Sequence, residues 1–320
     1  MKNRLGKFLS VVLPLLLGVI LIVYTYQQYS PEQIRTIQSY FRDADYFYIF
    51  LSLIIATIGV VSRAYRWKYS LEHMGYKTSF ANNFFAVSIG YMMNMTIPRS
   101  GEISRALIVK KYDDIPFDKG FGTIVAERVV DTLILLLLII VAFFVQFDVF
   151  KTFVLDKIPF EKTMWLLGIG SFLMILSGLA YFYSEFSIIL TIKKKISGLK
   201  EGLLSIVKME KKGAFIFHTF LIWLSYILMF YITIFALGET STLSLGAVLS
   251  SFIVGSLAIA VTSSGFGTYP VLMAKILLFY SISEPVGTAF GWIVWSSQIL
   301  LTLITGLISF LLLPVFNRNK

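Results

Sequence analysis

The sequence NMTIPRSGEISRA, residues 94–106, breaks an apolar stretch that begins near residue 80. Pro98 and Gly101 disfavour a continuous helix here, since a proline lacks a backbone donor and clashes with the preceding turn. Three charged side chains occupy the same short segment: Arg99, Glu102 and Arg105. Backbone groups freed by such a break need partners from protein or water if they lie within a membrane. The segment therefore predicts a helical hairpin with its tip at 98–101 and a hydrated cavity beside it.

Apolar segments long enough to cross a bilayer recur on both sides of this break. Hydrophobic residues make up 57% of the 320 residues and charged residues 14%, whereas a typical soluble domain has about 25% charged residues. A helix needs about 20 apolar residues to cross a hydrocarbon core of about 30 Å. Six runs meet this requirement, at roughly 8–26, 46–62, 121–147, 164–183, 215–237 and 286–313. The chain is therefore predicted to be an all-α polytopic membrane protein with six full transmembrane helices.

The distribution of lysine and arginine predicts the orientation of these helices, because cytoplasmic loops carry an excess of positive charge. Seven lysines in 184–214 assign that segment to the cytoplasm. The side of the membrane alternates with each span that precedes this segment. Both ends of 80–120 are therefore cytoplasmic, and 63–79 is a cytoplasmic loop. Counting from the basic tail makes both ends of 243–283 external. These two segments are therefore predicted to be re-entrant hairpins. Both termini are then cytoplasmic, and 21 of the 28 lysines and arginines lie on that side.

This topology contains an internal symmetry. The order helix, helix, cytoplasmic hairpin, helix in residues 1–147 recurs upside down, with an external hairpin, in residues 164–313. A 3+3 inverted-topology repeat of this kind is a known transporter architecture, with the substrate site near mid-membrane at the repeat interface. We therefore expect residues 1–320 to form a single transmembrane domain in which the two hairpin tips approach each other. The alternative is eight ordinary spans with some charges out of place.

A second group of charges begins the span after the first hairpin: Glu127, Arg128 and Asp131. An ionised side chain at the bilayer centre costs about 2.5–3.5 kcal/mol or more, so these charges need partners or water. Arg128 and Asp131 are spaced i, i+3, which allows pairing on one helix face.

Two interpretations of the six charges remain open. They form a neutral lattice of ion pairs with a structural role, or, with Asn94, they line a polar cavity for an anionic headgroup. In the second case the planar guanidinium groups bind phosphate. Glu127 or Asp131 then exchanges a proton or receives a cationic group.

The second predicted hairpin has its tip in the sequence SSGFG, residues 263–267, followed by Tyr269 and Pro270. Glycines permit the turn, and hydroxyls and backbone amides are suited to face a phosphate. A turn without any ligand is the alternative. The residues assigned to the two tips are Pro98, Gly101, Ser263, Ser264, Gly265, Gly267 and Tyr269.

Several classes of function are disfavoured by what the sequence lacks. With no cysteine and only His73 and His218, thiolate and histidine metal sites are not expected. No GxxxxGK[ST] motif occurs, so ATP-driven pumping by this chain is not expected. We expect no cofactor and no catalytic residue. We also expect no nucleic-acid partner, because membrane orientation already accounts for the basic residues.

The strings NMTIPRSGEISRA (94–106) and VAERVVDTLILL (125–136) resemble the signature of the flippase-like family named for the transmembrane region of lysylphosphatidylglycerol synthase. The resemblance covers essentially the whole chain. It implies a membrane domain that translocates lipids or lipid-linked substrates between the leaflets of a bacterial plasma (inner) membrane. The residues that match the charged motif of the family are Arg99, Glu102, Arg105, Glu127, Arg128 and Asp131.

The sequence departs from the family pattern in two ways. Members often carry Pro-Gly-Gly-x-Gly-x-x-Glu in the second hairpin, whereas no glutamate follows the glycines here. The chain also ends at Lys320, without room for a soluble aminoacyl-transfer domain, so lipid aminoacylation is not expected.

The resemblance and the charges together favour a lipid flippase whose partners are membrane lipids, either an anionic phospholipid or a polyprenyl-linked substrate. A second hypothesis is an intramembrane transferase or hydrolase that acts on lipid headgroups, with Glu127 or Asp131 as general base. A third is a non-catalytic membrane partner of a lipid-modifying enzyme.

Overall fold

The computed structural model describes residues 16, 18–97, 99–147, 206–262 and 264–318, with six isolated positions between 165 and 190. Within this part of the chain all regular structure is helical. Contacts divide the chain into two compact units, residues 1–125 with 209–320 and residues 126–208. Pro98, Ser263 and nearly all of the predicted span 164–183 lie outside the described residues.

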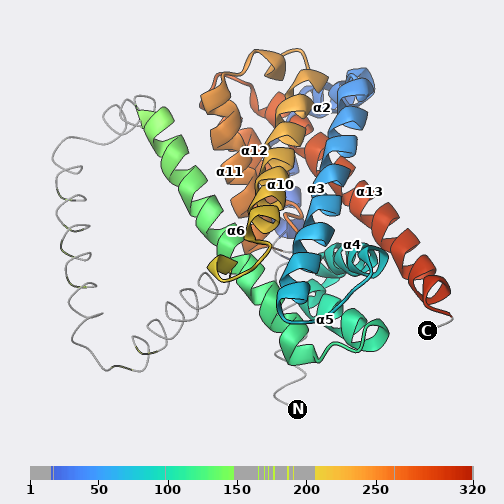
Figure 1. Ribbon diagram of the computed structural model, residues 1–320. Coiled ribbons are helices and arrows are strands. Elements are labelled where there is room, and N and C mark those ends of the chain that lie inside the picture. The colour runs from blue at the N-terminus through green and yellow to red at the C-terminus, as the bar shows by residue number, and fades with distance from the viewer. Residues whose placement is uncertain are drawn as a thin grey trace. The chain divides into compact units, whose positions relative to one another are not determined.

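Four helices are long and apolar enough to cross a membrane: α3 (Tyr46–His73), α6 (Phe117–Val145), α10 (Lys212–Thr233, continued to Ala236 by a 3-10 turn) and α13 (Glu284–Phe316). They coincide with four of the six predicted spans. The span predicted at 8–26 is described in its second half, as the apolar helix Gly18–Gln27. Within the first unit, α3 and α10 pack along each other (Figure 1).

The structure corrects one boundary that matters for function. Residues 63–73 were expected in a cytoplasmic loop, but α3 continues through them to His73. Arg63 and Arg66 are buried within this helix and contact α10. Their burial explains the difference, because the sequence rule treats arginine as a marker of the membrane boundary.

The first predicted hairpin is built from α4 (Phe80–Thr96) and α5 (Ser100–Tyr112). The two helices meet backbone to backbone, since a Cβ atom on Gly101 would lie 2.1 Å from the carbonyl oxygen of Gly90. Asn94 closes the hairpin, because its Oδ1 accepts the backbone N–H of Gly101 at 2.7 Å. Gly101 is therefore required by the close approach of the two helices.

The second predicted hairpin is built from α11 (Leu245–Val261) and α12 (Thr268–Leu278). These helices also pack closely, since a Cβ atom on Gly255 of α11 would lie 2.7 Å from the ring of Tyr269. Tyr269 was expected at the tip, but it is buried as the second residue of α12. Its ring belongs to the hairpin core.

Helix α13 supports both hairpins. A Cβ atom on Gly291, in its first half, would lie 2.6 Å from Pro270 of α12. A Cβ atom on Gly306, in its second half, would lie 2.6 Å from the Cβ atom of Met92 in α4. The second hairpin therefore rests on the first half of α13, and the first hairpin rests on the second half.

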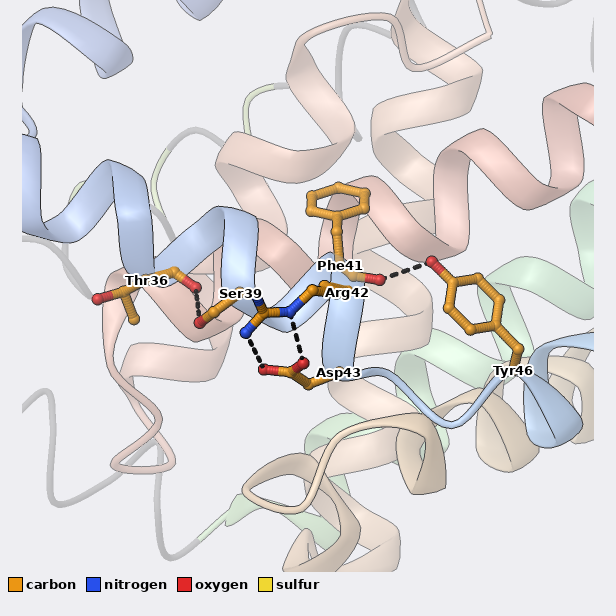
Figure 2. Close-up of polar contacts among 6 residues, drawn as sticks. All are labelled: Thr36, Ser39, Phe41, Arg42, Asp43 and Tyr46. Carbon is orange, nitrogen blue, oxygen red and sulfur yellow. Dashed lines mark hydrogen bonds and ion pairs between the residues drawn. The ribbon is translucent and has the colours of Figure 1, made fainter.

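A short amphipathic helix, α2 (Pro31–Asp43), packs on the N-terminal end of α13. Ser30 caps it in a capping box with Gln33, and Ile37 is buried against Tyr29 and Ala289. Its exposed residues are mostly polar, among them Glu32, Arg35, Gln38, Arg42 and Asp43. Figure 2 shows local contacts among residues of α2 and Tyr46. Side chains of this polar region bond locally: Ser39 to the Thr36 carbonyl at 2.8 Å, Arg42 to Asp43 at 3.0 Å and Tyr46 to the Phe41 carbonyl at 2.6 Å.

Replacing Gly101 by alanine is expected to destabilise the protein by about 1–3 kcal/mol, the usual cost of overpacking, because the new Cβ meets the backbone of Gly90. Thermal unfolding in detergent measures the change. Gly122→Ala is the matched control, since Gly122 lies in α6 with nothing within 4 Å of its Cβ position. If both variants unfold at the parental temperature, the close contact within the hairpin is wrong.

Tyr40 of α2 donates a hydrogen bond to the carboxylate of Glu239, which raises the pKa of Tyr40 from 10.0 to about 12. Because the folded pKa exceeds the unfolded one, this contact stabilises the fold fully below about pH 10. The stabilisation is lost as the pH rises through about 12. The difference in tyrosinate absorbance between the parent and Tyr40→Phe should therefore titrate near 12, and Glu239→Gln should lower that midpoint. A midpoint at the ordinary value in the parent would contradict the contact.

Candidate functional site at the two hairpin tips

The two hairpins touch near their tips. The Ser264 hydroxyl lies 3.4 Å from the carbonyl oxygen of Asn94 and donates to it. This contact joins Ser264, which the sequence assigned to the second tip, to Asn94, which the sequence assigned to the substrate site. The approach of residues 98–101 to residues 263–267 stays a prediction. The first helix lies against the second tip, because a Cβ atom on Gly267 would lie 2.3 Å from the carbonyl oxygen of Gly18.

Arg99 occupies the first tip, immediately before α5. Its backbone is left-handed, with φ of 64°, and its side chain is exposed. Few residues other than glycine and asparagine adopt this conformation, and strained residues of this kind cluster at functional sites. Ser100 follows, and its hydroxyl donates to the carbonyl oxygens of Met93 and Ile97 at 2.8 and 2.7 Å. The turn is thus fixed by local hydrogen bonds while the arginine side chain projects from it.

The second tip is held by hydrogen bonds and by α13. Thr262 Oγ1 accepts the backbone N–H of Gly265 at 3.1 Å. Trp295 of α13 donates its indole N–H to the carbonyl oxygen of Ser264 at 2.8 Å. Ser264 is also left-handed, with φ of 54°, as are Gly265 and Gly267. Among its described residues, each tip therefore contains one non-glycine residue in the left-handed region.

The remaining charges of the first hairpin have different environments. Arg105 is buried, and its guanidinium carbon lies 4.2 Å from the centre of the Trp67 ring, a close cation–π contact. Trp67 in turn donates its indole N–H to Thr123 of α6 at 3.0 Å. Glu102 is half-buried. Of the three predicted charges in this hairpin, Arg99 alone is exposed.

Glu127, Arg128 and Asp131 lie on α6, in the part that belongs to the second unit. Glu127 and Asp131 are buried. Arg128 and Asp131 form the ion pair predicted from their spacing, at 3.7 Å. The structure thus brings together Asn94, Arg99, Gly101, Ser264, Gly265 and Gly267 at the tips. A cavity shared by these residues and the charges of α6 stays a prediction.

Sequence reasoning missed two arginines. Arg63 and Arg66, on α3, are 3% and 0% exposed. They lie one turn apart on the face that also carries Gly59, Trp67 and Ser70, all buried in the structure. The spacing of these residues along one helix face is visible in the sequence. The expectation that arginines mark the end of a span overrode this signal.

No group of three or more histidine, aspartate or glutamate side chains suited to a metal ion occurs among the described residues.

Comparison with known proteins identifies several relatives. A UPF0104 membrane protein of Pyrococcus horikoshii is 23% identical over 289 residues, covering 80% of this chain and 83% of the relative. A UPF0104 membrane protein of Methanocaldococcus jannaschii is 35% identical over 103 residues, which is 31% of each chain. The glycosyltransferase AglD of Haloferax volcanii is 26% identical over 133 residues, 41% of this chain and 21% of that protein.

These relatives are archaeal, so they give no support to the bacterial membrane that was expected. The chain spans less than a third of the Methanocaldococcus relative and of AglD in these matches. No solved structure matches the chain. The profile of the family described as the lysylphosphatidylglycerol synthase TM region matches residues 11–308. The chain is therefore a multi-pass membrane protein that belongs to this family.

Proposed function

We propose that this protein moves an anionic lipid, or a lipid-linked substrate with an anionic headgroup, between the two leaflets of a membrane. The observation that carries the proposal is the exposed side chain of Arg99 beside the contact between two helical hairpins. A guanidinium group offers phosphate a planar fork of donors and stays charged at every physiological pH. A headgroup that reaches the tips therefore meets a fixed positive charge.

The depth of the tips supports this proposal. Met92, near the end of α4, contacts α13 at Gly306, and Ser264 contacts it at Trp295. These two positions lie on either side of the middle of a helix that has 33 residues. Because α13 is long and apolar enough to cross a membrane, the tips lie about halfway across if it does so. This is the geometry expected of re-entrant hairpins.

Similar construction of the two hairpins supports the proposed inverted repeat. In each, a serine caps a first helix of 17 residues, Ser79 for α4 and Ser244 for α11. In each, a residue with positive φ and no side-chain cap precedes the shorter second helix, Arg99 for α5 and Gly267 for α12. Inverted repeats with interrupted helices bind substrates near mid-membrane. We propose that Glu102, Arg105, Glu127, Arg128 and Asp131 line the same path.

A second candidate is suggested by AglD, whose name describes a glycosyltransferase. The match covers 21% of that protein, so its activity does not transfer directly. An intramembrane enzyme acting on a lipid headgroup, or a membrane partner of such an enzyme, is the alternative proposal. Purified protein that modifies a lipid chemically in liposomes would favour it over transport.

The proposed plasma-membrane topology, with both termini cytoplasmic, can be tested with single cysteines in this cysteine-free chain. Lys119 and Thr242 are exposed positions on the two sides of the proposed membrane. In cells, a membrane-impermeant thiol reagent should label Thr242→Cys directly and Lys119→Cys only after permeabilisation. Labelling of Lys119→Cys in intact cells would overturn the cytoplasmic entry of the first hairpin.

Replacing Arg99 by glutamine should leave insertion and thermal stability unchanged, because the side chain is exposed and makes no ion pair among the described residues. Transfer of a fluorescent anionic lipid between liposome leaflets should slow by about tenfold or more, as expected for a lost hydrogen-bonded charge contact of about 1.5–3 kcal/mol. Arg99→Lys should restore the rate only in part, since lysine lacks the fork of donors.

Arg42→Gln is the matched control for this measurement. Arg42 is also an exposed arginine, but it bonds Asp43, its neighbour in α2 (Figure 2). Transfer should be unchanged in this variant. If Arg99→Gln also transfers lipid at the parental rate, the charges at the tips are a structural lattice and the proposed function fails.

A further inference from the structure

The helix that follows Arg99 lacks the usual cap at its start. The residue before a helix normally uses its side chain to accept a backbone N–H of the first turn. Ser79 and Ser244 do so for α4 and α11, at 3.1 and 3.3 Å. Arg99 holds this position for α5 and provides no side-chain cap, because a guanidinium group has donors and no acceptor. The first turn of α5 therefore needs an acceptor from another residue.

Asn94, in the last turn of α4, supplies this acceptor. Its Oδ1 atom accepts the N–H of Gly101, the second residue of α5, at 2.7 Å. A capping side chain accepts an N–H at this position or at the next one. The amide lies against the start of α5, since a Cβ atom on Gly101 would be 2.7 Å from the Asn94 Nδ2 atom. Asn94 therefore caps α5, while the exposed side chain of Arg99 projects from the turn.

The backbone of Asn94 is also the point at which the second hairpin touches the first. Its carbonyl oxygen accepts the Ser264 hydroxyl at 3.4 Å. The carbonyl oxygen of Ser264 accepts the indole N–H of Trp295 at 2.8 Å, and the Trp295 ring lies 5.7 Å from the ring of Phe266. A chain of hydrogen bonds therefore runs from α13 through the second tip and Asn94 to the start of α5. All of these residues belong to the first compact unit.

We propose that Asn94 and Trp295 are positioning residues, which act on lipid transfer by holding Arg99 in the conformation that meets the headgroup. In this proposal Asn94 is not a ligand, because its side-chain acceptor serves α5 and its carbonyl oxygen serves the second tip. The left-handed backbone of Arg99, with φ of 64°, is the feature that they hold, since such a turn persists only when its surroundings fix it. The inference rests on the proposed transport function and names the residues that orient its binding group.

A spin label attached to Arg99→Cys tests the positioning without any need for transport. The chain has no cysteine of its own, so the nitroxide spectrum of the full-length protein in nanodiscs reports the mobility of this turn alone. Asn94→Ala should make the label more mobile, because the cap is lost. Asn94→Asp should leave the label as it is, because a carboxylate also accepts the N–H of Gly101. Trp295→Phe keeps an aromatic ring but removes the indole N–H, and it should also raise the mobility.

Two variants are matched controls for the label. Asn83→Ala removes another asparagine of α4, which donates to Thr78 at 2.8 Å near the other end of the helix. Trp223→Phe removes an indole N–H that has no hydrogen-bond partner within the described part of the chain. Neither control should change the spectrum. An unchanged spectrum in Asn94→Ala, or an equal change in the controls, would overturn the positioning role, and an unchanged spectrum in Trp295→Phe would remove Trp295 from it.

Lipid transfer between liposome leaflets shows whether Asn94 acts through Arg99. In the parental protein, Asn94→Ala should slow transfer of a fluorescent anionic lipid by about fivefold or more, as the loss of a helix cap implies. In the Arg99→Gln background the same change should slow transfer by less than about twofold, because the group that Asn94 positions is already gone. Equal factors in the two backgrounds would mean that Asn94 binds the headgroup itself or only stabilises the fold. Either result overturns the inference.

The two measurements distinguish failure of this inference from failure of the proposed function. A label that responds as expected in a protein that transfers no lipid would confirm the positioning of residue 99 and reject transport. Transfer that depends on Arg99 but not on Asn94 or Trp295 would keep the proposed function and overturn the inference. If Asn94→Ala does not fold, Ser264→Ala and Trp295→Phe decide in both assays, because they leave the amide of Asn94 in place.

Discussion

Close packing against α13 is the constraint on which the arrangement of the hairpins depends. Gly287 and Gly291 leave room for α12, and Gly306 leaves room for α4. At each of these positions a Cβ atom would lie under 3.0 Å from an atom of the neighbouring helix. Small residues allow such approach between helices in membranes, where association depends on van der Waals packing rather than on the hydrophobic effect. Because both hairpins pack against the same helix, the positions of its glycines constrain where the two tips lie along it.

The second constraint is the burial of the arginines. Its cost in free energy opposes the gain from close packing. Close packing excludes water, so every arginine enclosed by α3, α4 and α10 loses hydration that its neighbours must replace. Aromatic rings do part of this, because a desolvated cation–π contact is worth about 2 kcal/mol, and Arg105 has such a contact with Trp67. Hydroxyl groups of Tyr226 and Thr219 supply another part. Buried arginines contribute little to stability, because well-packed apolar residues can often replace buried ions without loss of stability.

Much of this fold could be predicted from sequence because its signals are local. The first hairpin follows from a glycine and an adjacent charged segment within an apolar stretch, and the second from the glycines of residues 263–267. The Arg128–Asp131 pair is local in the same way. The end of α3 was not predictable by the same means. Arg63 contacts Tyr226, which is 163 residues away, and Arg66 contacts Thr219, which is 153 residues away.

The error at α3 has a general physical cause. The bias of lysine and arginine toward the cytoplasm describes side chains that reach water at the membrane boundary. An arginine that is covered by another helix does not reach this water. Its position depends on the packing of the helices, and its partners come from distant parts of the chain. Tyr269 illustrates a similar limit, because it was assigned to the second tip, whereas its ring is buried beside Gly255. The sequence signals therefore did not show which side chains of these segments are buried.

The difference between the two tips supports the weight that our proposal gives to Arg99. Both second helices begin after a residue with positive φ, and at the second tip that residue is Gly267, which adopts this conformation without strain. At the first tip it is Arg99, for which the left-handed region costs about 1–2 kcal/mol relative to the right-handed one. Glycine would make the turn at lower cost there, and the exposed side chain contributes no ion pair within the described part of the chain that would offset the strain. The hydrogen bonds of Ser100 and of Asn94 hold the turn in this conformation, and a left-handed arginine at a tip is the kind of outlier from which a functional hypothesis is argued. It supports our proposal that the guanidinium group binds an anionic headgroup.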